Sequence, residues 1–244
     1  MCSVDSNNRF TIAVLTDVHG NLPALEAVLE EVQTRQCDLV YHTGDSIAIG
    51  PFPSECLALL LRKPNVRMIM GNHERYLVNG IPEPRPDYIS DGELAHQEWV
   101  KDQLSEQQMA RLRLLPYTIT HEFCGVRAAF IHSCLDSNGY DFTNIEAGSA
   151  EELDRYFSFL AADIVFFGHL HRPSRTKGEK DYCNPGAAGC SRDSRARFAL
   201  LHLQNGEYRV ERVDIEYDVG RVLTELERRD VPDWEFIAKT FYGA

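Results

Sequence analysis

Short runs of apolar, β-branched residues alternate with helical patterns in the first half of the chain. These runs predict buried strands over Phe10–Thr16, Leu39–His42 and Val66–Met70. Between the strands, apolar positions recur at helical spacing after a cap at Asn21, and a shorter helix is expected over Ser54–Arg62. This alternation is typical of an α/β layer fold, in which crossover helices join parallel strands.

The pattern changes between residues 74 and 115. Three prolines between Ile81 and Pro86 exclude regular helix or central strand there, because proline lacks the N–H donor and restricts the backbone. Polar helical segments follow over Gly92–Leu104 and Ser105–Leu115. We interpret residues 74–115 as a helical cap inserted into a single domain that spans residues 1–244. Insertions of this length often carry specificity.

Strands return after residue 117. Two hairpins are predicted, one around Cys124-Gly125 and one around Asn205-Gly206, because such pairs suit tight turns between apolar runs. The other predicted elements are a strand over Ile164–Phe167 and helices near residues 150–160, 219–229 and 233–241.

The composition predicts a globular protein of the cytoplasm. Of the 244 residues, 43% are apolar and 25% are charged, which excludes intrinsic disorder. No apolar stretch approaches the ~18 residues of a membrane helix, and the first residues lack the pattern of a secretory signal, so no membrane partner is expected. The seven cysteines are scattered and include no C-x-x-C, which fits thiols in a reducing compartment.

The net charge of −12 argues against stable nucleic-acid binding, because surfaces that bind nucleic acid are usually basic. The segment Arg172–Arg197 runs against this average, with seven basic and three acidic residues. It is either a solvated loop face or a local attraction for phosphate, and the charge pattern by itself favours neither.

Five predicted strands end in side chains that commonly bind metals. These side chains are Asp17, His19, Asp45, Asn72, His73, His132, His169 and His171. Because ligands bind at the carboxyl ends of strands in open α/β sheets, we expect all eight to converge on one crevice. Imidazoles with two carboxylates and one amide suit Mn, Fe, Ni, Co or Zn better than Mg or Ca.

The number of these side chains bears on how many ions they bind. Seven ligands are more than one ion needs, whereas two ions about 3.5–4 Å apart that share a carboxylate would use them all. Taken singly, the Asp-x-His, Gly-Asp and Gly-Asn-His motifs are mostly turns, and Gly-His-x-His is moderately specific. Turns alone do not explain five such motifs in this order, each after an apolar run.

The motifs resemble those of the calcineurin-like metallophosphoesterases, most closely their compact bacterial and archaeal phosphodiesterase branch. They are Asp17-x-His19, Gly44-Asp45, Gly71-Asn72-His73-Glu74, His132 and Gly168-His169-x-His171. The resemblance spans about Thr11 to Leu201. It implies an α/β (α+β) fold, a four-layer α/β/β/α sandwich of two mixed sheets, with the helical cap as an insertion.

The resemblance also implies a role for each residue. One ion would be held by Asp17, His19 and His171, the other by Asn72, His132 and His169, with Asp45 bridging both. His73 would not bind metal; in similar enzymes it faces the scissile phosphate and donates a proton or a hydrogen bond. Manganese is the first choice of metal, with Fe, Ni, Co or Zn as alternatives.

Other residues bear on the substrate. The segment Cys183–Gly189 resembles the Asn-Pro-Gly-Ser-x-Gly loop of the branch, with Ala187 in place of Ser. Protein Ser/Thr phosphatases of the superfamily carry arginines at the positions of Ile49 and Met70, and such arginines favour dianionic monoesters. The candidate substrate contacts are Asn184, Arg192 and His96, although Arg192 is equally well explained as a surface arginine.

We therefore expect a dinuclear metal-dependent phosphoesterase for phosphodiester or nucleotide-type substrates, in which a metal-bridging hydroxide attacks phosphorus while His73 assists. The alternatives are a dinucleoside polyphosphate hydrolase and a phosphomonoesterase of the same superfamily. A non-catalytic, metal-bound scaffold for protein interactions is a remote alternative, because Asn72, His73 and every ligand position are present. The expected partner is a small phosphoester or nucleotide, and a homo-oligomer stays open.

Overall fold

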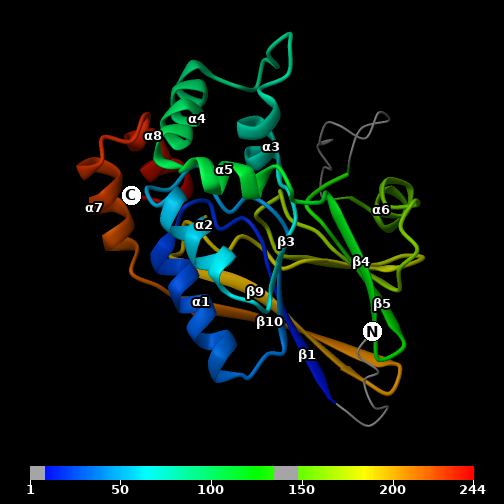
Figure 1. The fold of residues 1–244 in the computed structure, drawn as a ribbon. Coiled ribbons are helices and arrows are strands. Elements are labelled where there is room, and N and C mark those ends of the chain that lie inside the picture. The colour runs from blue at the N-terminus through cyan, green and yellow to red at the C-terminus, as the bar shows by residue number, and fades with distance from the viewer. Residues whose placement is uncertain (1–8, 135–147) are drawn as a thin grey trace.

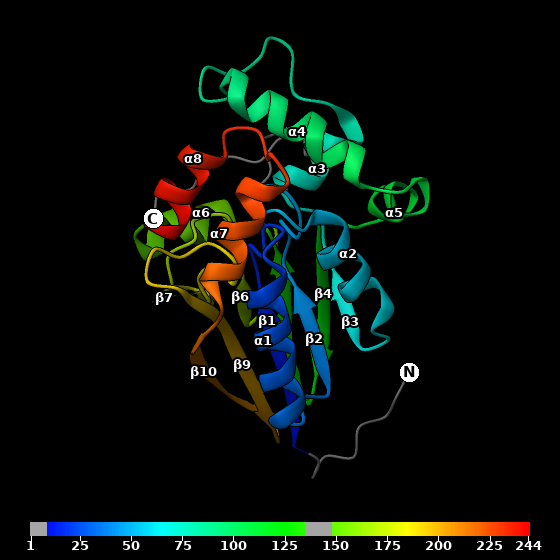
Figure 2. The same ribbon diagram turned by 90° about the vertical axis from the view of Figure 1, so that its left-hand side faces the viewer.

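The computed structural model describes residues 9–134 and 148–244. Two mixed five-stranded sheets pack face to face, and helices lie on their outer sides (Figure 1 and Figure 2). The predicted α/β fold with two mixed sheets is therefore confirmed.

The first sheet combines three parallel strands with an antiparallel hairpin. Its parallel strands and their crossover helices are β1 (Phe10–Leu15), α1 (Leu22–Thr34), β2 (Leu39–His42), α2 (Pro53–Arg62) and β3 (Val66–Met68). The hairpin consists of β9 (Arg195–Gln204) and β10 (Glu207–Glu216), and the order is β10-β9-β1-β2-β3. Its turn residues Asn205 and Gly206 both have positive φ, as a tight two-residue turn requires. The predicted cap of α1 is also present, because the Asn21 side chain accepts a hydrogen bond from the Ala24 N–H.

The second sheet has three parallel strands between two antiparallel edges. Its strands are β4 (Thr118–Phe123), β5 (Val126–Ile131), β6 (Ile164–Phe166), β7 (Ser174–Lys177) and β8 (Asp181–Asn184), in the order β4-β5-β6-β8-β7. The sequence analysis missed β7 and β8. Both have four residues, and β7 is a polar edge strand whose Arg175 forms an ion pair with Asp181 of β8 at 2.7 Å. β7 therefore has no apolar alternation to reveal it, and the apolar run of the buried β8 is only two residues long, Tyr182 and Cys183.

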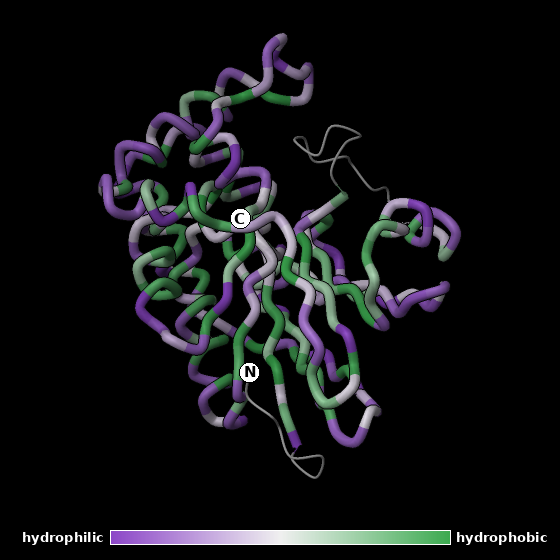
Figure 3. The backbone as a smooth tube through the Cα atoms, turned by 45° about the vertical axis from the view of Figure 1, so that its right-hand side comes forward, coloured by the Kyte–Doolittle hydropathy of each residue, from purple (hydrophilic) through white to green (hydrophobic). Residues whose placement is uncertain are grey.

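Alternating side chains of each sheet serve two different layers. In β1, Ile12 and Val14 pack between the two sheets with Phe130, whereas Ala13 and Leu15 pack beneath the helices that cover the first sheet. On the far side, α6 (Ala150–Tyr156) covers the second sheet. Figure 3 shows that the hydrophobic residues concentrate along the central strands. These layers account for the four-layer sandwich that the resemblance implied.

Three helices lie between β3 and β4 in the chain. They are α3 (Asn72–Asn79), α4 (Asp91–Gln103) and α5 (Glu106–Leu112). Ser90 and Ser105 cap α4 and α5 through their side chains. The helix predicted over Ser105–Leu115 ends at Leu112 in the structure, three residues earlier than predicted. That residues 74–115 act as a cap stays a prediction.

The end of the chain differs from the predicted single helix over residues 233–241. After α7 (Val219–Arg228), the chain forms the short helix α8 (Trp234–Ile237) and then a π-helical turn, Ala238–Tyr242. This C-terminal segment, residues 233–242, packs against Ile49 and Cys190. Figure 2 places α8 beside α4 above the ends of the strands. Among the residues that the structure describes, no helix has the length and apolar character that crossing a membrane requires.

Candidate metal centre

The predicted ligands meet where the two sheets present the carboxyl ends of their parallel strands. Asp17 and His19 follow β1, Asp45 follows β2, Asn72 follows β3, His132 follows β5, and His169 and His171 follow β6. Three of these strands belong to the first sheet and two to the second. The packing of the two sheets therefore brings together ligands that lie up to 154 residues apart in the sequence.

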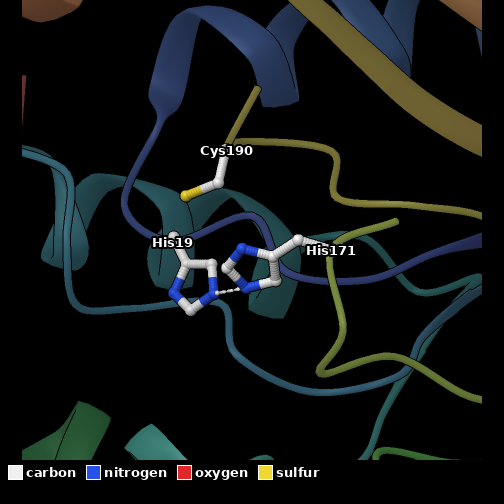
Figure 4. Close-up of side chains that lie close together, drawn as sticks. All are labelled: His19, His171 and Cys190. Carbon is white, nitrogen blue, oxygen red and sulfur yellow. Dashed lines mark hydrogen bonds between the residues drawn. The ribbon is translucent and has the colours of Figure 1, made fainter. Parts of the chain in front are cut away.

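One group of side chains forms around His19 and His171. Their Nε2 atoms face each other (Figure 4) and lie 2.9 Å apart. Asp17 Oδ1 lies 3.7 Å from Nε2 of His19 and 3.6 Å from Nε2 of His171. The thiol of Cys190 joins this group, since its sulfur lies within 4.8 Å of a ring nitrogen of each histidine. The sequence analysis did not predict Cys190, because no motif connects it to these histidines.

A second group forms around Asn72. Its Oδ1 lies 3.0 Å from His132 Nε2 and 3.0 Å from His169 Nδ1. Asp45 connects the two groups, because its Oδ2 lies 3.2 Å from His132 Nε2 and 3.7 Å from His19 Nε2. One carboxylate oxygen thus faces both sets of nitrogen atoms.

The orientation of the imidazoles fits metal binding. Nδ1 of His132 donates to the Thr43 carbonyl at 2.8 Å, and Nδ1 of His19 donates to the Ile47 carbonyl at 3.3 Å. Both rings therefore turn Nε2 toward the centre, in the arrangement by which a backbone carbonyl orients a metal-binding histidine. The shortest distances between candidate ligand atoms, 2.9 to 3.2 Å, are close to the ~3.0 Å between neighbouring ligands of an octahedral ion with bonds of about 2.1 Å.

Burial and neighbouring charges shift the pKa values of the acidic and basic groups in this cluster. Burial raises the pKa of Asp17, and nearby His171 and His132 offset only part of that rise. Burial alone would also raise the pKa of Asp45, but the charge of His132 and the hydrogen bond from that ring hold it well below its ordinary value. Burial opposes protonation of His132, yet Asp45 raises its pKa to about 9. A metal ion would supply the positive charge that a proton on His132 otherwise provides.

Two other histidines are neutral at pH 7. Burial lowers the pKa of His19 well below its ordinary value and that of His169 to about 3. A neutral imidazole keeps a lone pair for an ion, so both residues have the protonation state that a metal ligand needs.

The backbone is strained at most of these ligands. The residues with positive φ are Asp17 (53°), His19 (46°), Asp45 (59°), His169 (70°) and His171 (57°). Residues other than glycine adopt this region at a cost of order 1–3 kcal/mol each, and such strain clusters at functional sites. The turns after the strands thus direct the side chains toward one point, and the backbone of these turns is strained as a result.

Glu74 holds two of these turns together. Its buried carboxylate accepts hydrogen bonds from the N–H groups of Asp45, Ser46 and Gly71 and from the Ser46 hydroxyl, at 2.6 to 2.9 Å. A side chain at Gly71 would overlap Asp45 Oδ1, so glycine lets the loop after β3 approach that carboxylate. The sequence analysis included Glu74 in a motif but assigned it no role; its position three residues after the helix cap Gly71 is the signal for one.

His73 lies beside the two groups. Its backbone N–H donates to Asp45 Oδ1 at 3.0 Å, and its ring meets that of His19 edge to face, with 5.2 Å between centroids. The side-chain amide of Gln97, on α4, donates to His73 Nδ1 at 2.7 Å. Because Nδ1 accepts this hydrogen bond, the proton of the neutral ring lies on Nε2. The sequence analysis missed Gln97, since only the packing of α4 against α3 brings it to His73.

Comparison with known families identifies the fold and the motifs together. A model of the calcineurin-like phosphoesterase superfamily domain matches residues 10–206, a range that contains every predicted ligand and His73. The chain belongs to the calcineurin-like phosphoesterase superfamily. The family that the motifs indicated is therefore confirmed, and members of this phosphoesterase superfamily act on phosphoesters.

Individual relatives cover the phosphoesterase domain to different extents. An uncharacterized protein of Methanocaldococcus jannaschii is 27% identical over 239 residues, which are 91% of this chain and 94% of the relative. A crystal structure of a metallophosphoesterase from Sphaerobacter thermophilus superposes with a TM-score of 0.74 at 22% sequence identity. The match covers 95% of this chain and 99% of the Sphaerobacter thermophilus chain. A symmetrical bis(5'-nucleosyl)-tetraphosphatase of Yersinia enterocolitica is 37% identical over 78 residues, which are 30% of this chain and 27% of the relative.

The three predicted substrate contacts lie in different surroundings. Asn184 is buried, and its amide donates to the Gly168 carbonyl and accepts from the Gly186 N–H, so it holds the backbone beside the site. Arg192 is exposed and lines a cavity of about 470 Å³ next to His171. His96 is buried on α4 and lines a second cavity, next to His73. Contact of these residues with a substrate stays a prediction.

Proposed function

We propose that this chain is a dinuclear metal-dependent phosphoesterase that hydrolyses phosphodiester or nucleotide-type substrates. In this proposal Asp17, His19 and His171 bind one ion, and Asn72, His132 and His169 bind the other. The position of Asp45 carries the proposal, since its Oδ2 lies within 3.7 Å of nitrogens from both groups. A carboxylate that bridges both ions is typical of two-metal sites, in which the ions lie about 3.5–4 Å apart.

In this proposal His73 is the residue of the chain that acts on the substrate beside the two ions. Two divalent ions would supply Lewis acidity, which lowers the pKa of a water molecule and offsets charge on phosphoryl oxygens. A ring nitrogen of His73 lies within 4.8 Å of ligand atoms of His19 and Asp45. With Nδ1 engaged by Gln97, the His73 Nε2–H donates to a phosphoryl oxygen or to the departing oxygen.

The absence of two arginines favours a diester over a monoester. Ile49 and Met70 stand where the protein phosphatases of the superfamily carry phosphate-clamping arginines, and both are buried. A dianionic monoester gains most from bidentate arginine contacts. Ile49 also lines the cavity beside His73, so that side of the site offers an apolar surface to the substrate.

A dinucleoside polyphosphate is the second candidate substrate. The Yersinia enterocolitica tetraphosphatase shares 37% identity with this chain over 78 residues. The cavity beside His171 also carries Arg172 and Arg192, whose charges suit additional phosphates. This candidate uses the same metal centre and differs only in the group that leaves.

The deciding experiment is a matrix of metals and substrates. The purified chain is loaded with Mn, Fe, Ni, Co or Zn and assayed with bis-p-nitrophenyl phosphate, p-nitrophenyl phosphate and diadenosine tetraphosphate. We expect metal-dependent hydrolysis, fastest with Mn and slowest for the monoester. Bound metal without turnover of any of the three compounds would contradict the proposal and favour a non-catalytic scaffold.

A further inference from the structure

A cavity of about 270 Å³ lies beside His73, between the start of α4 and the C-terminal segment. It is smaller than the ~300–1,000 Å³ typical of sites that enclose a drug-sized ligand, so it suits one ring system. Because His73 forms part of its wall, the cavity is continuous with the proposed catalytic centre.

The walls of this cavity combine apolar rings with acidic groups. Ile49 and Phe241 are apolar parts of the wall, and two exposed aromatic side chains, Tyr88 and Phe236, also contribute. Its carboxylates belong to Glu93 and Asp233, and none of the described lining residues is Lys or Arg. Such a lining attracts a flat aromatic group that donates hydrogen bonds and repels another phosphate.

His96 forms part of the wall of the same cavity. Its side chain is only 4% exposed, and both of its ring nitrogens are buried away from solvent. One ring face stacks on Trp99, with 5.8 Å between centroids. Burial and the nearby His73 lower the pKa of His96 to about 4, against an opposite effect of the Pro232 carbonyl. The wall at this position is therefore a neutral aromatic ring and adds no charge to the cavity.

The cavity on the other side of the centre has the opposite charge. It lies next to His171 and is lined by Arg172, Arg192 and Arg197, and Phe241 forms part of both cavities. Arg197 is already paired with Asp193 and Asp214. The exposed Arg172 and Arg192 make this the side on which an anionic part of a substrate is stabilised. The two cavities therefore separate a site for a neutral ring from a site for phosphate.

We propose that the cavity beside His73 binds the heterocyclic base of the leaving nucleoside, and specifically a base with an exocyclic amino group. Glu93 and Asp233 accept hydrogen bonds from the amino group, the neutral ring of His96 forms part of the wall beside the base, and Tyr88 and Phe236 cover the base at the mouth of the cavity. This inference rests on the proposed phosphoesterase activity, because it places the base on the side where His73 serves the departing oxygen.

The test measures nucleoside binding directly, without turnover. Adenosine is titrated into the metal-loaded chain, and purine riboside, which lacks only the exocyclic amino group, serves as the matched ligand. The two tryptophans of the chain report the binding by fluorescence, because Trp99 stacks on His96 and Trp234 lies in α8. We expect adenosine to bind about tenfold more tightly than purine riboside, the effect of one hydrogen bond to a charged acceptor.

Two pairs of variants locate the binding. Glu93→Gln removes one carboxylate of the cavity, whereas Glu98→Gln removes an exposed carboxylate of the same helix that does not line it. Phe236→Ala removes an aromatic ring that is 56% exposed, and Phe159→Ala removes one that is 59% exposed elsewhere. We expect Glu93→Gln to abolish the preference for adenosine and Phe236→Ala to weaken both nucleosides, with both control variants unchanged.

The outcomes distinguish this inference from the proposed function. If bis-p-nitrophenyl phosphate is hydrolysed but neither nucleoside binds, or if the control variants weaken binding as much as the cavity variants, the inference is wrong and the phosphoesterase proposal stands. If adenosine binds with the expected preference but no phosphoester is hydrolysed, the base site stands and the proposed function fails.

Discussion

The Gln97 amide lies 2.7 Å from Nδ1 of His73 and connects α4 to the proposed catalytic histidine. Gln97 is buried, whereas His73 is half-buried and lines the neighbouring cavity. A second hydrogen bond holds His73 itself, because its backbone N–H donates to Asp45 Oδ1. Through Gln97, the segment between β3 and β4 thus sets the direction and the protonated nitrogen of the His73 ring.

Replacement of Gln97 by Leu should lower kcat with little effect on KM. The ring of His73 would lose the partner that keeps its proton on Nε2, and we expect a decrease of about tenfold, the value of one well-placed hydrogen bond. Metal content should not change, and the pH profile of kcat should shift relative to the original chain. Gln103→Leu, on the same helix, is the matched control and should behave like the original chain. Equal effects of both variants would show that Gln97 acts only through the stability of α4.

Replacement of His73 by Ala should abolish most turnover and leave both metal ions in place. His73 contributes proton donation and charge stabilisation but none of the proposed ligand atoms, so a loss of about 10²- to 10³-fold in kcat is expected. Metal content by elemental analysis and kcat for bis-p-nitrophenyl phosphate check this together. Loss of an ion in this variant would mean that His73 is a ligand, as its closeness to His19 and Asp45 also permits.

Replacement of Glu74 by Leu should destabilise the chain and weaken metal binding. Three backbone N–H groups and one hydroxyl would lose their acceptor in a buried site, and leaving such groups unsatisfied costs about 1–3 kcal/mol each. We expect a decrease in Tm of at least about 5 °C, measured by calorimetry. Glu98→Leu, at an exposed position, is the control. An unchanged Tm together with full metal occupancy would contradict the role of Glu74.

The end of α7 should contribute a stability term that acid removes. Hydrogen bonds from Arg228 and Arg229 lower the pKa of Glu225 from its ordinary 4.5 to about 2. Arg229 also donates to the Pro51 carbonyl and to Glu55. Because the folded-state pKa is the lower one, the stabilisation is complete above pH ~4.5 and is lost as the pH falls toward 2.

Calorimetry of a Glu225→Gln variant tests this term. The Tm of the original chain should exceed that of the variant by about 2 °C above pH ~5, a small effect because the pair is near the surface. The difference should decrease steadily below pH ~4.5. A difference that is independent of pH between 2 and 6 would show that the charge of Glu225 does not contribute.

Most of the candidate centre could be predicted from the sequence because each predicted ligand lies shortly after a strand, although metal binding by these residues stays a prediction. Asp17, Asp45 and His132 are recognisable from the apolar runs before them, and the strand order then brings them together. Both hairpins were predicted for a different local reason, because their turn residues adopt the positive φ that tight turns need.

Contacts between distant segments account for what the sequence analysis missed. Gln97 reaches His73 across 24 residues, and Cys190 reaches His19 across 171 residues, with no local pattern that points to either contact. β7 was missed because it is polar, and β8 because only two of its four buried residues, Tyr182 and Cys183, are apolar. The cavity beside His73 combines α4 with the C-terminal segment, so it exists only in the folded chain.

The central claim is that two cations bind on either side of the Asp45 carboxylate. A crystal soaked in manganese and measured for anomalous scattering tests it most directly, with the Asp45→Asn variant as the comparison. The account predicts two manganese peaks about 3.5–4 Å apart in the original chain. It predicts a loss of occupancy in Asp45→Asn with the fold unchanged. A single peak away from Asp45, or no peak within reach of these side chains, would contradict the account.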